Sequence, residues 1–165
     1  MTPNDFRILP IVIDALEKPR EPRSILNYMC ACDTANPESR KGLNNEDVVS
    51  PLLTIWFASG SELDDLCQPF AEVIRELKAN PTTLVGNNWN SLDGKVAKVL
   101  LADQLSRSCF RGSAEAFSYD LIGFFCFCIR NLELNQVNDN GPILLYRNSM
   151  LRSHSSQYQF SEMIF

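Results

Sequence analysis

The chain has 165 residues, of which 45% are hydrophobic and 21% charged, and this composition is typical of a globular domain rather than a disordered chain. The net charge of −5 disfavours a nucleic-acid-binding protein, because contacts to phosphates need a basic surface. The longest strongly apolar run, residues 121–129, is much shorter than the roughly 20 residues that a membrane span needs. No secretion or transit signal is recognisable at the N-terminus. We therefore expect a cytoplasmic protein that binds neither membranes nor nucleic acid.

The first part of the chain carries the least regular pattern. Pro10 interrupts the apolar stretch 6–16, and residues 18–24 (KPREPRS) resemble a charged connector. We expect an irregular N-terminal extension over residues 1–44, followed by a helical domain over residues 45–165.

From residue 45 onward, hydrophobic residues recur at spacings of three and four, which predicts amphipathic helices. The first helix ends at Gly60. The next has a clean apolar stripe that Pro69 interrupts, so we expect a short helix followed by a longer one. A loop over residues 81–94 then separates these elements from a strong helix over residues 95–107.

A further helix is predicted over residues 113–131. Its apolar residues, Phe117 among them, cover most of its circumference, which is typical of a central helix buried on several sides. No segment shows the alternation expected of a strand. The sequence therefore predicts an all-α fold of stacked antiparallel helix pairs.

The six cysteines are expected to be reduced residues of the core rather than metal ligands. No C-x-x-C pair occurs, and His154 is the single histidine. Zinc sites usually combine such pairs with further cysteines or histidines. We expect no metal and no cofactor.

The most informative stretch is residues 99–120, VLLADQLSRSCFRGSAEAFSYD. It resembles the signature of the family catalogued as domain of unknown function 924, in which a helix ending in L-x-D-Q-F-x-R-N is followed by x-F-R-G-T and a helix rich in alanine and phenylalanine. The matching residues are Asp103, Gln104, Arg107, Phe110, Arg111, Gly112, Ala116, Phe117 and Asp120. Leu105, Ser108 and Ser113 stand where the family usually has Phe, Asn and Thr.

Weaker similarity extends the resemblance to about residues 51–131. Trp56-Phe57 is similar to the family's F-W-F, and Trp89 followed by Gly94-Lys95 is similar to its W-x-x-x-P-x-G-R. The resemblance implies an all-α, tetratricopeptide-like architecture and no particular reaction. Family members continue with an H-S-E motif that residues 152–155 match only in part. We therefore expect an atypical C-terminal part after about residue 141, as in a truncated member whose helical fold is incomplete there.

The candidate site consists of the polar and turn residues of the signature. These are Asp103, Gln104, Arg107, Phe110, Arg111 and Gly112. In a structural interpretation, Asp103 faces both Arg107 and Arg111 in an ion network, since residues four apart on a helix are neighbours. Phe110 then fills the seam between the two helices, and Gly112 permits the turn.

In a functional interpretation, Arg107 and Arg111 converge to bind an anion, with Asp103 and Gln104 orienting them. We favour the structural interpretation. A carboxylate mechanism using Asp103 and Asp120 would require the fold to bring these two residues together.

No motif of a known reaction is present, such as G-x-S-x-G, a P-loop or G-x-G-x-x-G, so the catalytic residues are unknown. We expect a helical interaction module that binds a protein or peptide in a groove. The alternative is a small-molecule enzyme or anion-binding protein that uses Asp103, Arg107 and Arg111.

Overall fold

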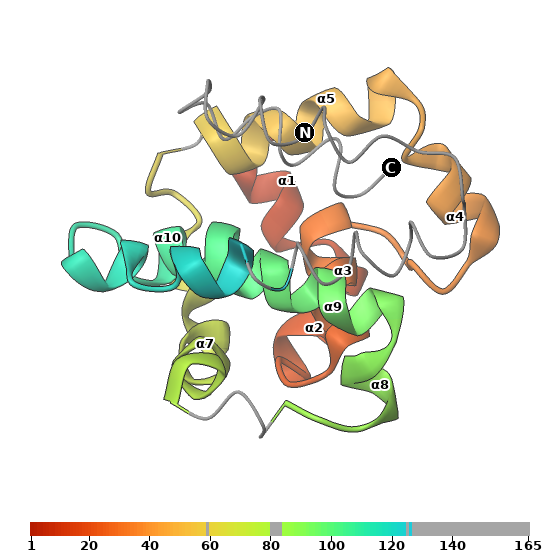
Figure 1. Cartoon of the computed structure of the whole chain (residues 1–165). Helices are drawn as coiled ribbons and strands as arrows, with labels where there is room; N and C mark the ends of the chain where they lie inside the picture. The colour runs from red at the N-terminus through yellow and green to blue at the C-terminus, as the bar shows by residue number, and fades with distance from the viewer. Residues whose placement is uncertain (59, 80–83, 125, 127–165) are drawn as a thin grey trace, which may run out of the picture.

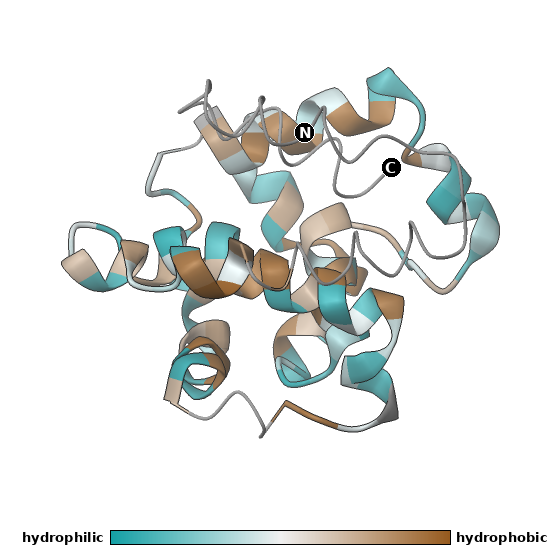
Figure 2. Ribbon diagram, viewed as in Figure 1, coloured by the Kyte–Doolittle hydropathy of each residue, from teal (hydrophilic) through white to brown (hydrophobic). Residues whose placement is uncertain are grey.

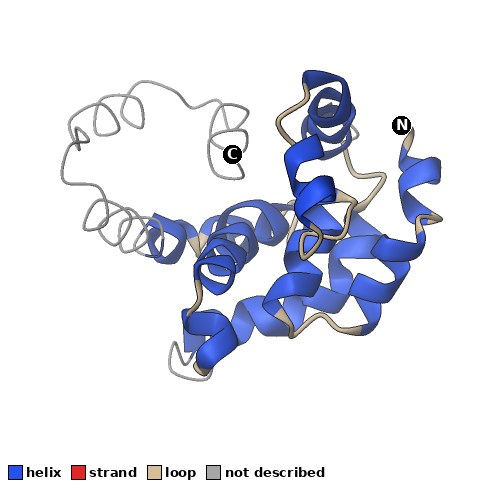
Figure 3. Ribbon diagram, turned by 90° about the vertical axis from the view of Figure 1, so that its right-hand side faces the viewer, coloured by secondary structure: helices blue, strands red, loops and turns tan. Residues whose placement is uncertain are grey.

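The computed structural model describes residues 1–58, 60–79, 84–124 and 126 (Figure 1). These residues form helices, turns and loops without a strand, which confirms the all-α fold class (Figure 3). The tetratricopeptide-like stacking stays a prediction, and the part after residue 141 lies outside the described residues. No helix in the described ranges combines the length and apolar character needed to cross a membrane.

The elements follow one another in short steps. They are α1 (Pro3–Arg7), α2 (Pro10–Glu17), α3 (Pro22–Cys30), α4 (Pro37–Gly42), α5 (Glu46–Ala58), α6 (Asp64–Cys67), η1 (Gln68–Phe70), α7 (Ala71–Ala79), α8 (Asn87–Asn90), α9 (Leu92–Val99), η2 (Leu100–Leu105), α10 (Ser106–Cys109) and η3 (Ala114–Phe117). α3 packs against α2 and α9 near the middle of the molecule (Figure 1). The hydrophilic α4 has no buried residue and lies at the edge (Figure 2).

The expectation of an irregular extension over residues 1–44 is wrong, because this segment forms α1 to α4. Each of the four helices begins with a proline. These are Pro3, Pro10, Pro22 and Pro37. A proline at the first position loses no helical hydrogen bond, since an N–H there has no partner within the helix, and its fixed φ suits a helix. Pro10, which suggested an interruption, and Pro22 of the expected connector are helix starts, whereas Pro19 lies in the turn between α2 and α3.

The N-terminal helices also supply part of the hydrophobic core. The rings of Phe6, Tyr28, Trp56 and Phe70 form a cluster whose contacting centroids lie 4.9–5.5 Å apart. The indole Nε1 of Trp56 donates a hydrogen bond to the carbonyl oxygen of Met29 at 3.0 Å. Because α1, α3, α5 and η1 meet in this cluster, the N-terminal helices are an integral part of the folded protein.

The helices of the central segment follow the sequence prediction closely. α5 ends at Ala58, just before Gly60, whose φ is +61°. Pro69 lies in η1, which separates the short α6 from the longer α7, as expected. The loop predicted over residues 81–94 is wrong in its second half, since it contains α8 with the buried Trp89 and the start of α9.

α9, η2 and α10 run on as one continuous helical segment from Leu92 to Cys109. Its middle part, η2, is a π-helix. Such wider turns are rare within α-helices and often lie at functional sites. The π-helix carries Asp103 and Gln104 and packs in the core through Leu100 and Leu101, both fully buried.

The single helix predicted over residues 113–131 is wrong in its first part. A 3₁₀ turn forms η3, and a new helix begins only at Asp120. Since a 3₁₀ helix has about three residues per turn, the apolar face rotates away from the one that an α-helix would bury. Phe117 is 62% exposed and Leu121 73% exposed, whereas Tyr119 occupies the buried position. The later part of this prediction lies outside the described residues.

Candidate functional site

Arg107 holds two carboxylates of the chain at once. Its Nη2 lies 3.0 Å from Oδ1 of Asp103 and 3.2 Å from Oδ1 of Asp120. Asp103 precedes Arg107 by four residues on the same helical segment, so their contact follows from the spacing. Asp120 lies beyond the η3 turn, so the fold brings the two aspartates to one guanidinium. We refer to Asp103, Arg107 and Asp120 as the Arg107 cluster.

The neighbours of the Arg107 cluster fix the position of Asp103. Gln104 Nε2 donates a hydrogen bond to Oδ2 of Asp103 at 2.5 Å, so both oxygens of this carboxylate have partners. Gly123, in the helix that begins at Asp120, faces the same residue. A Cβ added at Gly123 would lie 3.4 Å from Cβ of Ala102 and 3.7 Å from Cβ of Asp103. These are ordinary van der Waals distances, so the helix that begins at Asp120 packs directly against η2 at this point.

The Arg107 cluster carries more negative than positive charge. Burial raises the pKa of Asp120 above its ordinary value, and the charge of Asp103 adds to the rise while Arg107 opposes it. The Arg107 guanidinium also lies 5.0 Å from the ring centroid of Phe117, and its buried Nε has no hydrogen-bond partner among the described residues. Two carboxylates around one guanidinium disfavour the binding of an anion here.

Arg111 pairs with Asp64 of α6 rather than with Asp103. Its Nε lies 2.6 Å from Oδ2 of Asp64 and its Nη2 lies 3.0 Å from Oδ1, a bidentate contact. Nη2 also donates a hydrogen bond to the carbonyl oxygen of Gly60 at 2.9 Å. The expected network in which Asp103 faces both arginines is therefore wrong. Arg111 lies beyond the end of α10, where its side chain reaches α6 instead of η2.

The remaining signature residues shape the turn after α10. Gly112 has a φ of +79°, a conformation that favours glycine, so it permits the turn as expected. Phe110 is buried and stacks on the ring of Tyr119 at a centroid distance of 5.7 Å. The guanidinium of Arg75 covers the Phe110 ring at 4.7 Å. Phe110 therefore fills the seam where α7, α10 and η3 meet.

The structure thus divides the four polar candidate residues into two groups. Asp103, Gln104 and Arg107 lie together on one helical segment, whereas Arg111 contacts α6 across the turn. The two guanidinium groups do not converge on a shared ligand position, because each is held by different carboxylates.

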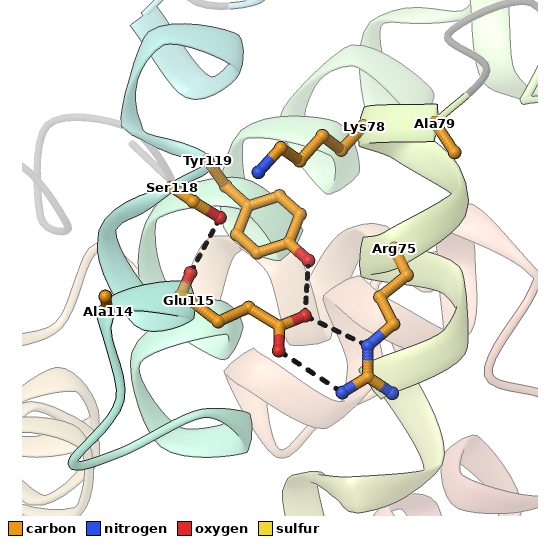
Figure 4. Close-up of a pocket in the computed structure, with 7 residues that line it drawn as sticks. All are labelled: Arg75, Lys78, Ala79, Ala114, Glu115, Ser118 and Tyr119. Carbon is orange, nitrogen blue, oxygen red and sulfur yellow. Dashed lines mark hydrogen bonds and ion pairs between the residues drawn. The ribbon is translucent and has the colours of Figure 1, made fainter.

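A second site lies between α7 and η3, where an open pocket of about 630 Å³ is present. Its lining residues are Arg75, Lys78, Ala79, Ala114, Glu115, Ser118 and Tyr119 (Figure 4). We refer to it as the α7–η3 pocket. Within it, Arg75 Nε lies 2.9 Å from Oε1 of Glu115, and the hydroxyl of Tyr119 donates a hydrogen bond to the same oxygen at 2.9 Å (Figure 4).

The charges of the α7–η3 pocket are only partly neutralised. The hydrogen bond from Arg75 is the main cause of a lowered pKa of Glu115, so this carboxylate stays ionised beside Arg75. Lys78 lies over the ring of Tyr119, with Nζ 5.3 Å from the centroid, and forms no ion pair with a carboxylate in the described part of the chain. Burial raises the pKa of Tyr119 to about 12, so the phenol adds no negative charge at neutral pH.

Sequence reasoning missed the α7–η3 pocket, although part of its signal was present. Arg75 and Lys78 stand three apart on the polar side of the α7 stripe, which places them on one helix face. The contact of Arg75 with Glu115 depends on the 3₁₀ turn of η3, which the sequence pattern did not predict.

Three of the five cysteines that the structure describes lie in the core, while Cys32 and Cys126 are half-buried. Cys30, Cys67 and Cys109 are buried free thiols, and burial raises the pKa of Cys30 to about 12 and that of Cys67 to about 11. Such thiols are unreactive core residues, as expected. Within the described ranges, no cluster of three or more His, Cys, Asp or Glu side chains could hold a metal ion, and His154 lies outside them.

The fold and its Arg107 cluster define an all-helical protein organised around one helix–turn–helix signature. Residues 49–130, about half of the chain, match the family described as Bacterial protein of unknown function (DUF924). This match confirms the resemblance seen over residues 51–131, and the matched segment belongs to that family. Neither a curated protein nor a solved structure matches the chain.

Proposed function

We propose that this protein is a helical interaction module that binds a segment of a partner protein at the α7–η3 pocket. The observation that carries the proposal is the pocket itself, which is open to solvent and bordered by Lys78, a lysine that forms no ion pair with a described carboxylate. The free cysteines suit the reducing conditions of the cytoplasm, where we place the module.

The contacts of the signature arginines support this choice over a small-anion site. Arg111 already binds both oxygens of Asp64, and Arg107 binds Asp103 and Asp120. An anion entering either position would have to displace a carboxylate or lie beside one. The arginines therefore act best as links between helices, which leaves ligand binding to another surface.

The shape of the α7–η3 pocket suits a segment of a protein. The pocket is open, and its walls combine alanine side chains, an aromatic ring and charged groups on two separate elements (Figure 4). A peptide side chain can place apolar atoms against the ring of Tyr119 and a polar end near Lys78. Helical proteins commonly recognise peptides in such surface depressions.

The alternative function is an enzyme or small-molecule site at the Arg107 cluster. One observation favours it, namely that the fold brings Asp103 and Asp120 to the same guanidinium, with the pKa of Asp120 raised. A carboxyl group with a raised pKa is a candidate acid or base. Each oxygen of Asp103 already has a partner, however, in the hydrogen bond from Gln104 and the ion pair with Arg107, which favours a structural role.

The test selects random peptides displayed on phage against the full chain. Ala114→Trp fills the α7–η3 pocket without changing a charge, and Ala35→Trp is the matched control at an exposed position in the loop after α3. We expect the selected peptides to bind wild type and Ala35→Trp equally and Ala114→Trp at least about tenfold more weakly, since a filled pocket excludes its anchor side chain. Peptides that bind Ala114→Trp with unchanged affinity would contradict the proposed site.

A thermal shift assay with phosphate and succinate tests the alternative. If the protein is an interaction module, neither phosphate nor succinate should produce a saturable rise of its melting temperature. A saturable rise that Arg107→Met abolishes, together with no peptide enrichment, would favour a small-molecule site at the Arg107 cluster.

A further inference from the structure

We infer that the partner segment presents an acidic side chain to the α7–η3 pocket and that Lys78 receives its carboxylate. This inference rests on the proposed function and names the chemistry of its ligand. It follows from the charges that line the pocket and from the charge of the whole chain.

The charge balance inside the pocket is positive. Arg75 and Lys78 contribute two cations, and Glu115 contributes one carboxylate, which the hydrogen bonds from Arg75 and Tyr119 hold in place. Lys78 forms no ion pair with a described carboxylate, although its charge acts at longer range on Glu115 and helps to lower the pKa of that residue. Its ammonium group can therefore still receive the carboxylate of a ligand. A carboxylate that approached Lys78 would meet a cation without displacing an existing ion pair.

The position of Lys78 limits where that carboxylate can lie. The ammonium group is held over the ring of Tyr119, at one side of the pocket, while Arg75 and Glu115 lie at the other (Figure 4). The aliphatic part of an incoming Glu or Asp side chain would lie against Ala79, Ala114 and the Tyr119 ring, which line the same pocket. Such contacts favour a side chain of a peptide over a free inorganic anion, which has no apolar atoms to bury.

The net charge of the chain makes this preference selective. The sequence carries a net charge of −5, so most of the surface repels acidic segments and attracts basic ones without regard to site. A local surplus of positive charge in the α7–η3 pocket therefore directs an acidic side chain to this pocket and away from the rest of the surface.

The experiment compares three peptides, acetyl-Ala-Leu-Xaa-Leu-Ala-amide with Xaa as Glu, Gln or Lys, titrated into the ¹⁵N-labelled full chain. The backbone amide signals of Ala114 and Tyr119 report occupancy of the pocket. We expect the Glu peptide to bind wild type about threefold to tenfold more tightly than the Gln peptide, as for a partly exposed charge-assisted contact. Added salt should reduce this difference.

Charge reversal supplies the decisive variant. Lys78→Glu should bind the Lys peptide more tightly than the Glu peptide, whereas Lys41→Glu, at an exposed position in α4, should keep the wild-type order. Equal binding of the Glu and Gln peptides to wild type, or an unchanged order in Lys78→Glu, would overturn the acidic preference while leaving the pocket as a binding site. No saturable shift with any of the three peptides would overturn the binding site as well.

Discussion

Asp103 and Asp120, which lie on opposite sides of the η3 turn, share one nitrogen atom, Nη2 of Arg107. This arrangement links the π-helical η2 to the helix that begins at Asp120. Because Arg107 lies between the two carboxylates, it offsets a repulsion that would otherwise push the two helices apart. The signature of the family thus coincides with a junction between elements.

Replacing Arg107 should destabilise the protein. Arg107→Met leaves Asp103 and Asp120 near each other without a cation, and we expect a loss of about 1–2 kcal/mol in the free energy of unfolding, between the values for exposed and buried ion pairs. Urea denaturation measures it. The control is Arg23→Met, since Arg23 is exposed and lies 3.8 Å from Asp93, and its loss should be close to zero. Equal effects of the two substitutions would show that the Arg107 cluster stabilises nothing.

Two hydrophobic residues of the signature region should respond differently to truncation. Leu100 is fully buried, so Leu100→Ala should cost about 3 kcal/mol in the free energy of unfolding. Phe117 is 62% exposed and its ring centroid lies 5.0 Å from the Arg107 guanidinium, so Phe117→Ala should cost about 0.5 kcal/mol or less. Chemical denaturation of both variants measures the difference. A large loss in Phe117→Ala would mean that Phe117 is buried.

The N-terminal helices should contribute to global stability. Phe6→Ala removes a fully buried ring from the cluster with Tyr28 and Trp56, and we expect a loss of about 3 kcal/mol or more. Ile8→Ala, two residues along the chain at a position 72% exposed, is the matched control and should change stability by less than about 0.5 kcal/mol. If both variants melt like wild type, α1 does not belong to the cooperative unit.

The pKa values of two aspartates should be shifted in opposite directions from that of an ordinary aspartate. The pKa of Asp120 is raised, chiefly by burial, and that of Asp65 is lowered, chiefly by the hydrogen bond from Arg7. Asp65 therefore stabilises the fold above the unfolded pKa near 3.8, and this contribution is lost as the pH falls through its folded value. For Asp120, the stabilisation is present below the unfolded pKa and is lost as the pH rises through its folded value.

Carboxyl-carbon NMR titration of the native protein measures both values directly. Comparison with Asp120→Asn and Asp65→Asn assigns the two signals. A titration in which Asp120 releases its proton at a lower pH than Asp65 would contradict the described surroundings of both residues.

Local spacing predicted some contacts and not others. The pair of Asp103 and Arg107 follows from four residues on one helix, and the break at Pro69 follows from the missing N–H of proline. The partner of Arg111 could not be predicted in this way, since Asp64 is separated from it by 47 residues. Only the packing of α6 beside α10 brings these two side chains together.

The other errors have equally specific causes. A proline inside a helix interrupts it, whereas a proline at the first position begins one. Periodicity alone does not show which of the two applies to the prolines of residues 1–44. The apolar residues after residue 113 suggested one buried α-helix, but the 3₁₀ turn of η3 exposes Phe117 and buries Tyr119. The α7–η3 pocket depends on that same turn and was therefore missed.

The central claim is that the signature arginines hold helices together and leave ligand binding to the α7–η3 pocket. A double-mutant cycle of Arg111→Met with Asp64→Asn, run beside a cycle of Arg111→Met with Asp103→Asn, tests the claim most directly by urea denaturation. We predict a coupling energy of about 1 kcal/mol between Arg111 and Asp64, whose bidentate contact is partly exposed, and almost none between Arg111 and Asp103. No coupling to Asp64, with phosphate raising the melting temperature of wild type but not of Arg111→Met, would contradict the claim and identify Arg111 as part of an anion site.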